Sequence, residues 1–148
     1  MVYSVGEMAK QLGVTPSTLR YYDKEGLLPF VSRTKGGIRQ FKDSDYEWLQ
    51  VIECLKKTGM QLKDIKQFIL MAMDGDDTID QRLELIIKQQ QYVRQQIADM
   101  QQTLDTLDFK RWYYETAREA GSTSVPRNMS LEEIPEKYRE TRKRLRKE

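Results

Sequence analysis

Apolar residues recur at helical spacing near the start of the chain, in short blocks that end at glycine. The first block predicts a helix, because its apolar positions share one face: Val5, Met8, Ala9 and Leu12. Ser4 and Glu7 stand three residues apart before this block, which is the pattern of a capping box. Gly13 is expected to end the helix. A second short helix follows directly, so the two together predict a helix-turn-helix.

The second helix is expected to begin after Thr15, a residue that caps helices, with Pro16 at the first helical position and Gly26 just past the end. Leu19 and Tyr22 lie three apart and should face the core. Small hydroxyls and an arginine near the start of a helix suit the DNA major groove. The candidate DNA contacts are Thr15, Ser17, Thr18, Arg20 and Tyr21. Taken alone, this helix could equally be an ordinary amphipathic surface helix.

A β-hairpin is predicted next. Pro29 excludes a helix, and residues 30–33 and 38–41 can pair around the turn at Gly36 and Gly37. The hairpin would form a wing whose exposed cations lie along the phosphate backbone: Arg33, Lys35 and Arg39. The alternative is a solvated hairpin with charges that serve solubility.

Two more helices complete the predicted head. A capping box at Ser44 and Glu47 begins the first, whose inner stripe holds Tyr46, Leu49, Ile52 and Leu55 and which ends near Gly59. The next begins at about Gln61, with a stripe of Leu62, Ile65, Phe68, Ile69 and Ala72. The acidic, glycine-centred run 74–77 then marks a boundary.

A long helix with a heptad stripe follows, uninterrupted by Gly or Pro from Thr78 to Ala120. Gaps of four and three residues separate its seam positions, which are Ile79, Leu83, Ile86, Gln90, Val93, Ile97, Met100, Leu104 and Leu107. Such a stripe needs a partner, and a second copy of the chain is the economical one, so the pattern predicts a homodimer. Packing back onto the chain's own head is the alternative. The heptads alone do not set the strand direction.

The last segment is basic and weakly patterned. Trp112, Tyr113 and Tyr114 cannot all face one seam, so at least one should pack on another element or line a pocket. Glycine and proline break the helix between 121 and 126, and Ser130 with Glu133 resembles a further capping box, although Pro135 would disturb its first turn. Residues 137–147 predict a helix that is marginal unless it docks.

The composition narrows the range of possible functions. The 148 residues carry one cysteine and no histidine, so neither a transition-metal site nor a cofactor is expected, and no catalytic motif indicates an enzyme. No apolar run is long enough for a membrane span, which predicts a cytoplasmic protein. Residues 1–73 carry 11 Lys and Arg against 8 Asp and Glu, whereas residues 74–121 carry 6 against 10. A basic head before an acidic middle favours a nucleic-acid contact at the head.

The predicted fold is mainly α. It comprises a winged helix-turn-helix DNA-binding domain in residues 1–74, a long coiled-coil dimerisation helix in 75–121, and a short basic tail, partly helical, in 122–148.

The run from Thr15 to Pro29, with the wing ending Gly37-Ile38-Arg39-Gln40-Phe41, resembles the MerR family of transcriptional regulators. The resemblance covers residues 1 to about 120 and maps Thr18, Arg20 and Tyr21 to the recognition helix and Arg39 to the wing. It implies a homodimer with an antiparallel coiled coil that binds double-stranded promoter DNA across an overlong spacer. Effector binding would untwist and bend that DNA so that RNA polymerase engages both promoter elements.

Residues 54–60 and 112–115 resemble one branch, the AdhR/NmlR-type regulators of aldehyde and nitrosative stress. That resemblance implies an electrophile sensor at Cys54, and Lys57, three residues on, would favour its reactive thiolate form. Burial of Cys54 in the core is the competing interpretation. Two further alternatives stay open, namely a non-covalent ligand near Trp112–Tyr114 and an architectural DNA-binding protein that needs no effector.

Overall fold

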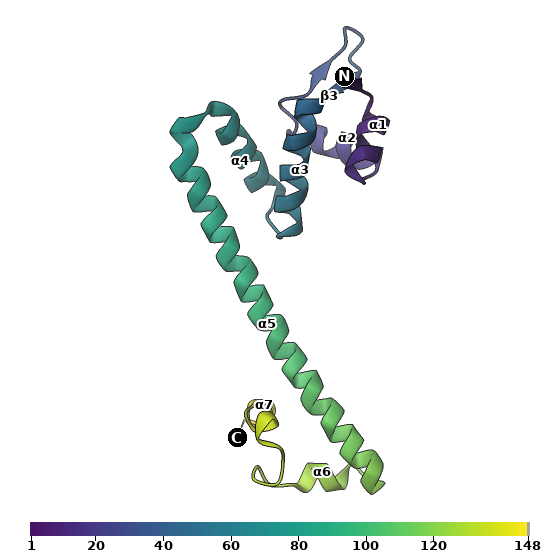
Figure 1. The fold of residues 1–148 in the computed structure, drawn as a ribbon, viewed down its shortest axis with the longest axis vertical. Helices are drawn as coiled ribbons and strands as arrows, with labels where there is room; N and C mark the ends of the chain where they lie inside the picture. Colours follow the sequence, from purple (N-terminus) through teal and green to yellow (C-terminus); the bar gives the residue numbers. More distant parts are fainter. Residues whose placement is uncertain (148) are drawn as a thin grey trace. The chain divides into compact units, whose positions relative to one another are not determined.

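The structure is a computed structural model that describes residues 1–147, and Figure 1 labels its α-helices and strand β3. The chain divides into two compact units, Met1–Val93 and the part from Arg94 onwards. Helix α5 (Ile79–Ala120) is an unbroken helix of 42 residues that begins in the first unit and ends in the second. Each unit is described by itself below.

The helix-turn-helix is confirmed. Helix α1 (Val5–Leu12) has Ser4 as its N-cap, and the predicted capping box forms: Ser4 Oγ accepts from the Glu7 N–H at 3.2 Å, and Glu7 Oε2 accepts from the Ser4 N–H at 2.8 Å. Gly13 ends it in the left-handed conformation, with φ 77°. Helix α2 (Pro16–Lys24) is capped by Thr15, and Gly26 follows with φ 78°. The two helices meet through buried Met8, Ala9, Leu19 and Tyr22.

The wing is confirmed, although it is shorter than predicted and has an additional strand. Strands β2 (Ser32–Arg33) and β3 (Arg39–Lys42) pair antiparallel, and Phe30 lies outside the ladder because its ring stacks on Trp48 at 5.8 Å. The two-residue strand β1 (Val2–Tyr3) pairs with the other edge of β3, giving the order β1-β3-β2. A strand of two residues is too short to show any periodicity, so the sequence pattern did not reveal it.

The predicted start of the third helix is wrong by two residues. Helix α3 (Asp43–Lys57) has Lys42 as its N-cap, not Ser44, because β3 continues to Lys42 and passes directly into the helix. Buried Asp45 accepts from the Lys42 N–H at 2.8 Å and satisfies one of the free amides of the first turn.

Helices α3 and α4 (Leu62–Asp74) close the core of the head. The predicted inner stripes are confirmed, since Leu49, Ile52 and Leu55 of α3 and Ile65 and Ile69 of α4 are buried. They pack with the apolar segment after α2 and with β3, through Leu27, Leu28, Phe41 and Met60.

The predicted break after α4 is confirmed. Gly75, with φ 107°, leads into the 3₁₀ turn η1 (Asp76–Thr78). The buried Thr78 hydroxyl donates to the Met71 carbonyl at 2.6 Å, and Arg82 Nη2 donates to the Gly75 carbonyl at 3.0 Å. These bonds tie the end of α4 to the start of α5, so the junction has a defined geometry.

The C-terminal unit folds back on its own part of α5. The half-formed box at Ser130, whose N–H donates to Glu133 Oε2 at 2.6 Å, does not begin a helix, because Pro135 interrupts it and acts as the N-cap of helix α7 (Glu136–Arg146). The short helix α6 (Ser124–Asn128) was not predicted. The ring of Tyr138 on α7 lies 6.1 Å from that of Phe109 and 5.6 Å from that of Trp112, so the tail helix docks on the aromatic end of α5.

The basic residues of α7 hold the preceding loop. Arg139 donates to the carbonyls of Ile134 and Glu132, Arg142 to that of Met129, and Arg146 to that of Arg127. One face of α7 therefore binds the main chain of residues 127–134. Three arginines of the tail donate their hydrogen bonds within the C-terminal unit.

Candidate nucleic-acid interface

Helix α2 presents a polar outer face and an anchored inner face. Arg20 and Tyr21 are exposed, as is Ser17, whereas Leu19 and Tyr22 are buried. Among residues 1–147, Arg20 forms no hydrogen bond or ion pair through its side chain, so its guanidinium is available to a ligand. This arrangement is what a recognition helix requires.

Thr15 and Thr18 are partly committed to the cap. Thr15 Oγ1 accepts from the Thr18 N–H at 3.2 Å, and the two hydroxyl oxygens lie 2.9 Å apart. Each hydroxyl can still hydrogen-bond a phosphate or a base, but both already stabilise the start of α2.

Tyr22 fixes α2 on α3. Its hydroxyl donates to Glu53 Oε1 at 2.6 Å and accepts from Lys56 Nζ at 2.9 Å, and the Lys56 ammonium lies 5.1 Å from the ring centroid. Burial and the hydrogen bond to Glu53 raise the pKa of Tyr22 well above its ordinary value of 10.0. The phenol therefore stays protonated and remains a hydrogen-bond donor, which holds α2 at a defined angle on α3.

The two wing arginines share one carboxylate oxygen of α2. Arg39 Nε donates to Asp23 Oδ2 at 2.6 Å, and Arg33 Nη2 donates to the same oxygen. Arg33 Nη1 also donates to the Gly37 carbonyl at 2.8 Å. The expectation that Arg39 is freely exposed is wrong, because only 23% of its side chain is accessible beside Asp23.

Asp23 was missed by the sequence analysis. The available signal was its charge. Asp23 lies with Glu25 among the basic residues of α2 and the wing, where an acidic side chain indicates an ion pair with one of them. Lys35, at the turn of the hairpin, is exposed and forms no hydrogen bond or ion pair through its side chain within the described chain.

Cys54 lies on the exposed side of α3. Burial in the core of its own chain, the competing interpretation, is therefore wrong. The thiol borders a groove of about 260 Å³ between α3 and α5, lined also by Leu55, Thr58, Ile86, Gln89, Gln90 and Val93. Lys57 is exposed on the same helix, whereas its neighbour Lys56 is occupied by Tyr22.

The predicted seam of α5 is uncovered in the single chain. Ile97 is 63% exposed and Met100 69%, and the other large apolar seam residues that remain exposed are Ile79, Leu83, Ile86, Leu104 and Leu107. Gln90 is exposed and Val93 half-buried. Packing of the stripe onto the chain's own head is not seen for these exposed positions.

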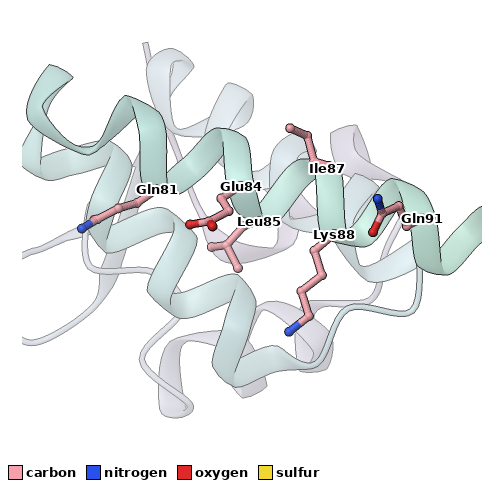
Figure 2. Close-up of a pocket in the computed structure, with 6 residues that line it drawn as sticks. All are labelled: Gln81, Glu84, Leu85, Ile87, Lys88 and Gln91. Atoms are coloured by element: carbon pink, nitrogen blue, oxygen red, sulfur yellow. The ribbon is translucent and has the colours of Figure 1, made fainter.

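Two further hollows are lined by residues of α5, or of α5 and α7. One, of about 450 Å³, is lined by residues of α5 alone; Figure 2 shows Ile87 on the opposite side of the helix from Leu85 and Lys88, with Gln81, Glu84 and Gln91 beside them. The other, of about 250 Å³, lies between α5 and α7 and combines aromatic with basic side chains: Phe109, Lys110, Tyr113, Tyr114, Arg142, Leu145 and Arg146.

Residues 1–147 contain no group of three or more His, Cys, Asp or Glu side chains that could hold a metal ion. No helix there is both long and apolar enough to cross a bilayer.

Comparison with known proteins gives consistent matches. Residues 3–71 match the model of the MerR HTH family regulatory proteins, and residues 46–108 match the model described as MerR, DNA binding. An uncharacterized HTH-type transcriptional regulator of Haemophilus influenzae is 45% identical over 92% of this chain and 98% of its own length. The HTH-type transcriptional regulator AdhR of Bacillus subtilis is 32% identical over 60% of this chain and 63% of its own.

A solved structure extends these matches. It is described as HiNmlR, a MerR family regulator lacking the sensor domain, bound to promoter DNA. It is 46% identical to this chain with a TM-score of 0.70, over 84% of this chain and 99% of the other.

Proposed function

Because this chain belongs to the MerR family, we propose that it binds promoter DNA as a homodimer, distorts the promoter spacer, and changes that distortion when an electrophile modifies Cys54. Its similarity to AdhR and to NmlR supports the same branch of the family. The chain is a DNA-binding transcriptional regulator and not an enzyme. The dimer, the distortion and the sensing chemistry are the parts proposed.

The observation that carries the proposal is the uncovered heptad stripe of α5. Seven large apolar seam residues are 41–69% exposed in the single chain. Burying the exposed half of each is worth about 1 kcal/mol, hence roughly 14 kcal/mol over two chains before the entropic cost of association. A second copy supplies the same stripe, so a homodimer covers both at once.

We expect the two helices to run antiparallel. Val93 is midway between the ends of the seam, Ile79 and Leu107, so an antiparallel pair centred there places Ile79 of one copy opposite Leu107 of the other. A parallel pair places each residue opposite itself. The two arrangements therefore bring different residues within the reach of a disulfide.

Cross-linking separates the two directions. In a Cys54→Ser background, Ile79→Cys and Leu107→Cys should form a mixed disulfide when the two variants are combined and oxidised, and neither should cross-link alone. Self-linking of each variant without the mixed product would refute the antiparallel dimer. Gln102→Cys, on the outer face of the same helix, is the matched control and should not cross-link.

Cys54 connects the sensing chemistry to this seam. Its groove is lined by Ile86, Gln90 and Val93, which are seam positions, so an adduct on the thiol would press on the surface that the second copy covers. RNA polymerase would respond indirectly, through the altered spacer. An electrophile such as formaldehyde should change transcription from the target promoter in the wild type and not in Cys54→Ser.

The same transcription assay, with a different promoter, tests the distortion of the spacer. A promoter with its spacer shortened to the length that the polymerase prefers should be transcribed without the regulator, and formaldehyde should then have no effect. Lys57→Met should slow alkylation of Cys54 by iodoacetamide if Lys57 takes part in the sensing site. Transcription that is identical in wild type and Cys54→Ser would eliminate Cys54 as the sensor.

A non-covalent effector is the second candidate, favoured by the hollow between α5 and α7. Its lining offers aromatic faces together with Lys110, whose ammonium has no hydrogen bond or ion pair within residues 1–147. Small aromatic carboxylates suit such a lining. In a Trp48→Phe background, benzoate should quench the fluorescence of Trp112, and Lys110→Met should abolish the effect. If no effector of either kind alters transcription, the chain acts as an architectural DNA-binding protein.

A further inference from the structure

The wing contains an electrostatic conflict that a residue outside the wing resolves. Arg33 and Arg39 are register partners across the β2–β3 ladder. Like charges placed directly opposite each other destabilise a strand pair. The carboxylate of Asp23, from helix α2, receives both guanidinium groups on a single oxygen and offsets their repulsion. The short hairpin therefore depends on α2 for its closure.

The two arginines differ in the donors they have left. Arg33 uses both terminal nitrogens, Nη2 on Asp23 and Nη1 on the Gly37 carbonyl. Arg39 uses only Nε on Asp23, and in residues 1–147 no hydrogen bond involves its Nη1 or Nη2. A bidentate contact with a phosphate requires two parallel N–H groups from one guanidinium. Arg39 is thus held by its stem side with its terminal edge available.

We propose that Asp23 and Arg33 are positioning residues that hold the terminal edge of Arg39 toward a DNA phosphate, so that the wing and the recognition helix contact the duplex at a fixed spacing. Arg33 closes the hairpin turn through Gly37, and Asp23 joins that hairpin to α2. Arg39 makes the contact. This division of roles needs only that the chain binds DNA, and it does not depend on the dimer direction or on the effector.

The proposal predicts an effect opposite in sign to simple electrostatics. Replacing Asp23 by Asn removes a negative charge near the DNA, and charge alone would tighten binding to any duplex. Loss of positioning instead weakens binding to a specific site. Glu25→Gln is the matched control, because Glu25 ends the same helix, is exposed, and forms no ion pair in the described chain.

The experiment uses the full chain and two duplexes: one selected by the wild-type protein from a random pool, and a scrambled duplex of the same composition. Asp23→Asn should weaken binding to the selected duplex by tenfold or more, while Glu25→Gln leaves that affinity unchanged or slightly tighter. Tighter binding of both duplexes by Asp23→Asn would overturn the proposal.

The salt dependence of binding assigns the phosphate contact. Arg39→Gln should lower the slope of log affinity against log salt by about 1, as expected for one lost phosphate contact. Arg33→Gln should weaken binding with the slope nearly unchanged. An equal fall of the slope in both variants would refute the division of roles.

Two further variants separate positioning from folding. Arg39→Lys keeps the charge but has no Nε donor for Asp23 and no paired terminal nitrogens, so it should lose affinity for the selected duplex even where the protein unfolds at the wild-type temperature. Asp23→Asn combined with Arg39→Gln should bind no more weakly than Arg39→Gln alone, because Asp23 acts through Arg39. Additive losses would show that Asp23 acts elsewhere and would contradict the proposal.

Discussion

Replacing Tyr22 by Phe tests how helix α2 is anchored to α3. The substitution removes one hydroxyl that donates to Glu53 at 2.6 Å and accepts from Lys56 at 2.9 Å, and it leaves the buried ring in place. A hydrogen bond to a charged partner is worth about 1.5–3 kcal/mol. The ring keeps its contacts with the core and with the Lys56 ammonium, so we expect a loss of about 2 kcal/mol in the free energy of unfolding of the head.

Urea unfolding followed by tryptophan fluorescence measures this loss. Trp48 lies on α3 and stacks on Phe30, so a Trp112→Phe background makes the signal specific to the head. Protein concentration is held constant, because the proposed association with a second copy would shift the apparent stability. Tyr21→Phe is the matched control: Tyr21 is 49% exposed and its hydroxyl has no hydrogen-bond partner in residues 1–147, so its removal should change stability by less than about 0.5 kcal/mol.

The pH dependence provides a second, independent readout. The folded state raises the pKa of Tyr22 above its ordinary value of 10.0, mainly through burial and then through Glu53. A raised pKa means that the stabilisation is fully present below pH 10 and is lost as the pH rises toward the folded value. The wild type should therefore lose stability above pH 10 more steeply than Tyr22→Phe. Equal stability of Tyr22→Phe and Tyr21→Phe, with parallel pH profiles, would refute the anchoring argument.

Three further predictions concern a cap, a turn and the seam. Ser4→Ala should cost about 1 kcal/mol of stability in thermal or urea unfolding, because it removes the hydroxyl that accepts from the Glu7 N–H; the Ser4 backbone N–H, the main cause that lowers the pKa of Glu7 from its ordinary 4.5, is kept, so the wild type and the variant should both lose stability as the pH drops below that value. Gly26→Ala should destabilise the head by about 1 kcal/mol, since φ is 78° there and the displaced Lys66 ammonium can move aside; an unchanged midpoint of urea unfolding would contradict this. Ile97→Asp should yield a monomer in analytical ultracentrifugation at micromolar concentration, whereas Gln102→Asp, on the outer face of α5, should leave the dimer intact.

The helical framework could be predicted because its signals are local. Ser4 with Glu7, Thr15 with Pro16, and Gly13 and Gly26 each specify a helix end through bonds to residues three or four positions away. The length of α5 and its apolar stripe could be predicted in the same way, since period and length are properties of one segment. The expected mode of DNA binding came from the family resemblance, because local patterns do not contain it.

The features that were missed depend on residues far apart in the chain. Strand β1 forms only because β3, forty residues later, offers it an edge. Ser44 is not the N-cap of α3, because strand β3 extends to Lys42 and the helix begins directly after it, nearer the N-terminus than predicted. Asp23 gained its role from Arg33 and Arg39, which lie 10 and 16 residues away on a different element. No periodicity or spacing rule predicts such long-range contacts, because they arise when the elements pack together.

The loop that α7 holds in the C-terminal unit shows a different kind of sequence dependence. Arg139, Arg142 and Arg146 bind carbonyl oxygens of residues 127–134, and every amino acid carries such an oxygen. The loop is thus held through main-chain carbonyl groups, which do not depend on the side chains of the loop. Apart from the buried Ile134, the side chains of this loop can change without weakening these bonds, whereas the three arginines cannot. Substitutions should therefore be tolerated better at the exposed positions of the loop than at the arginines that bind it.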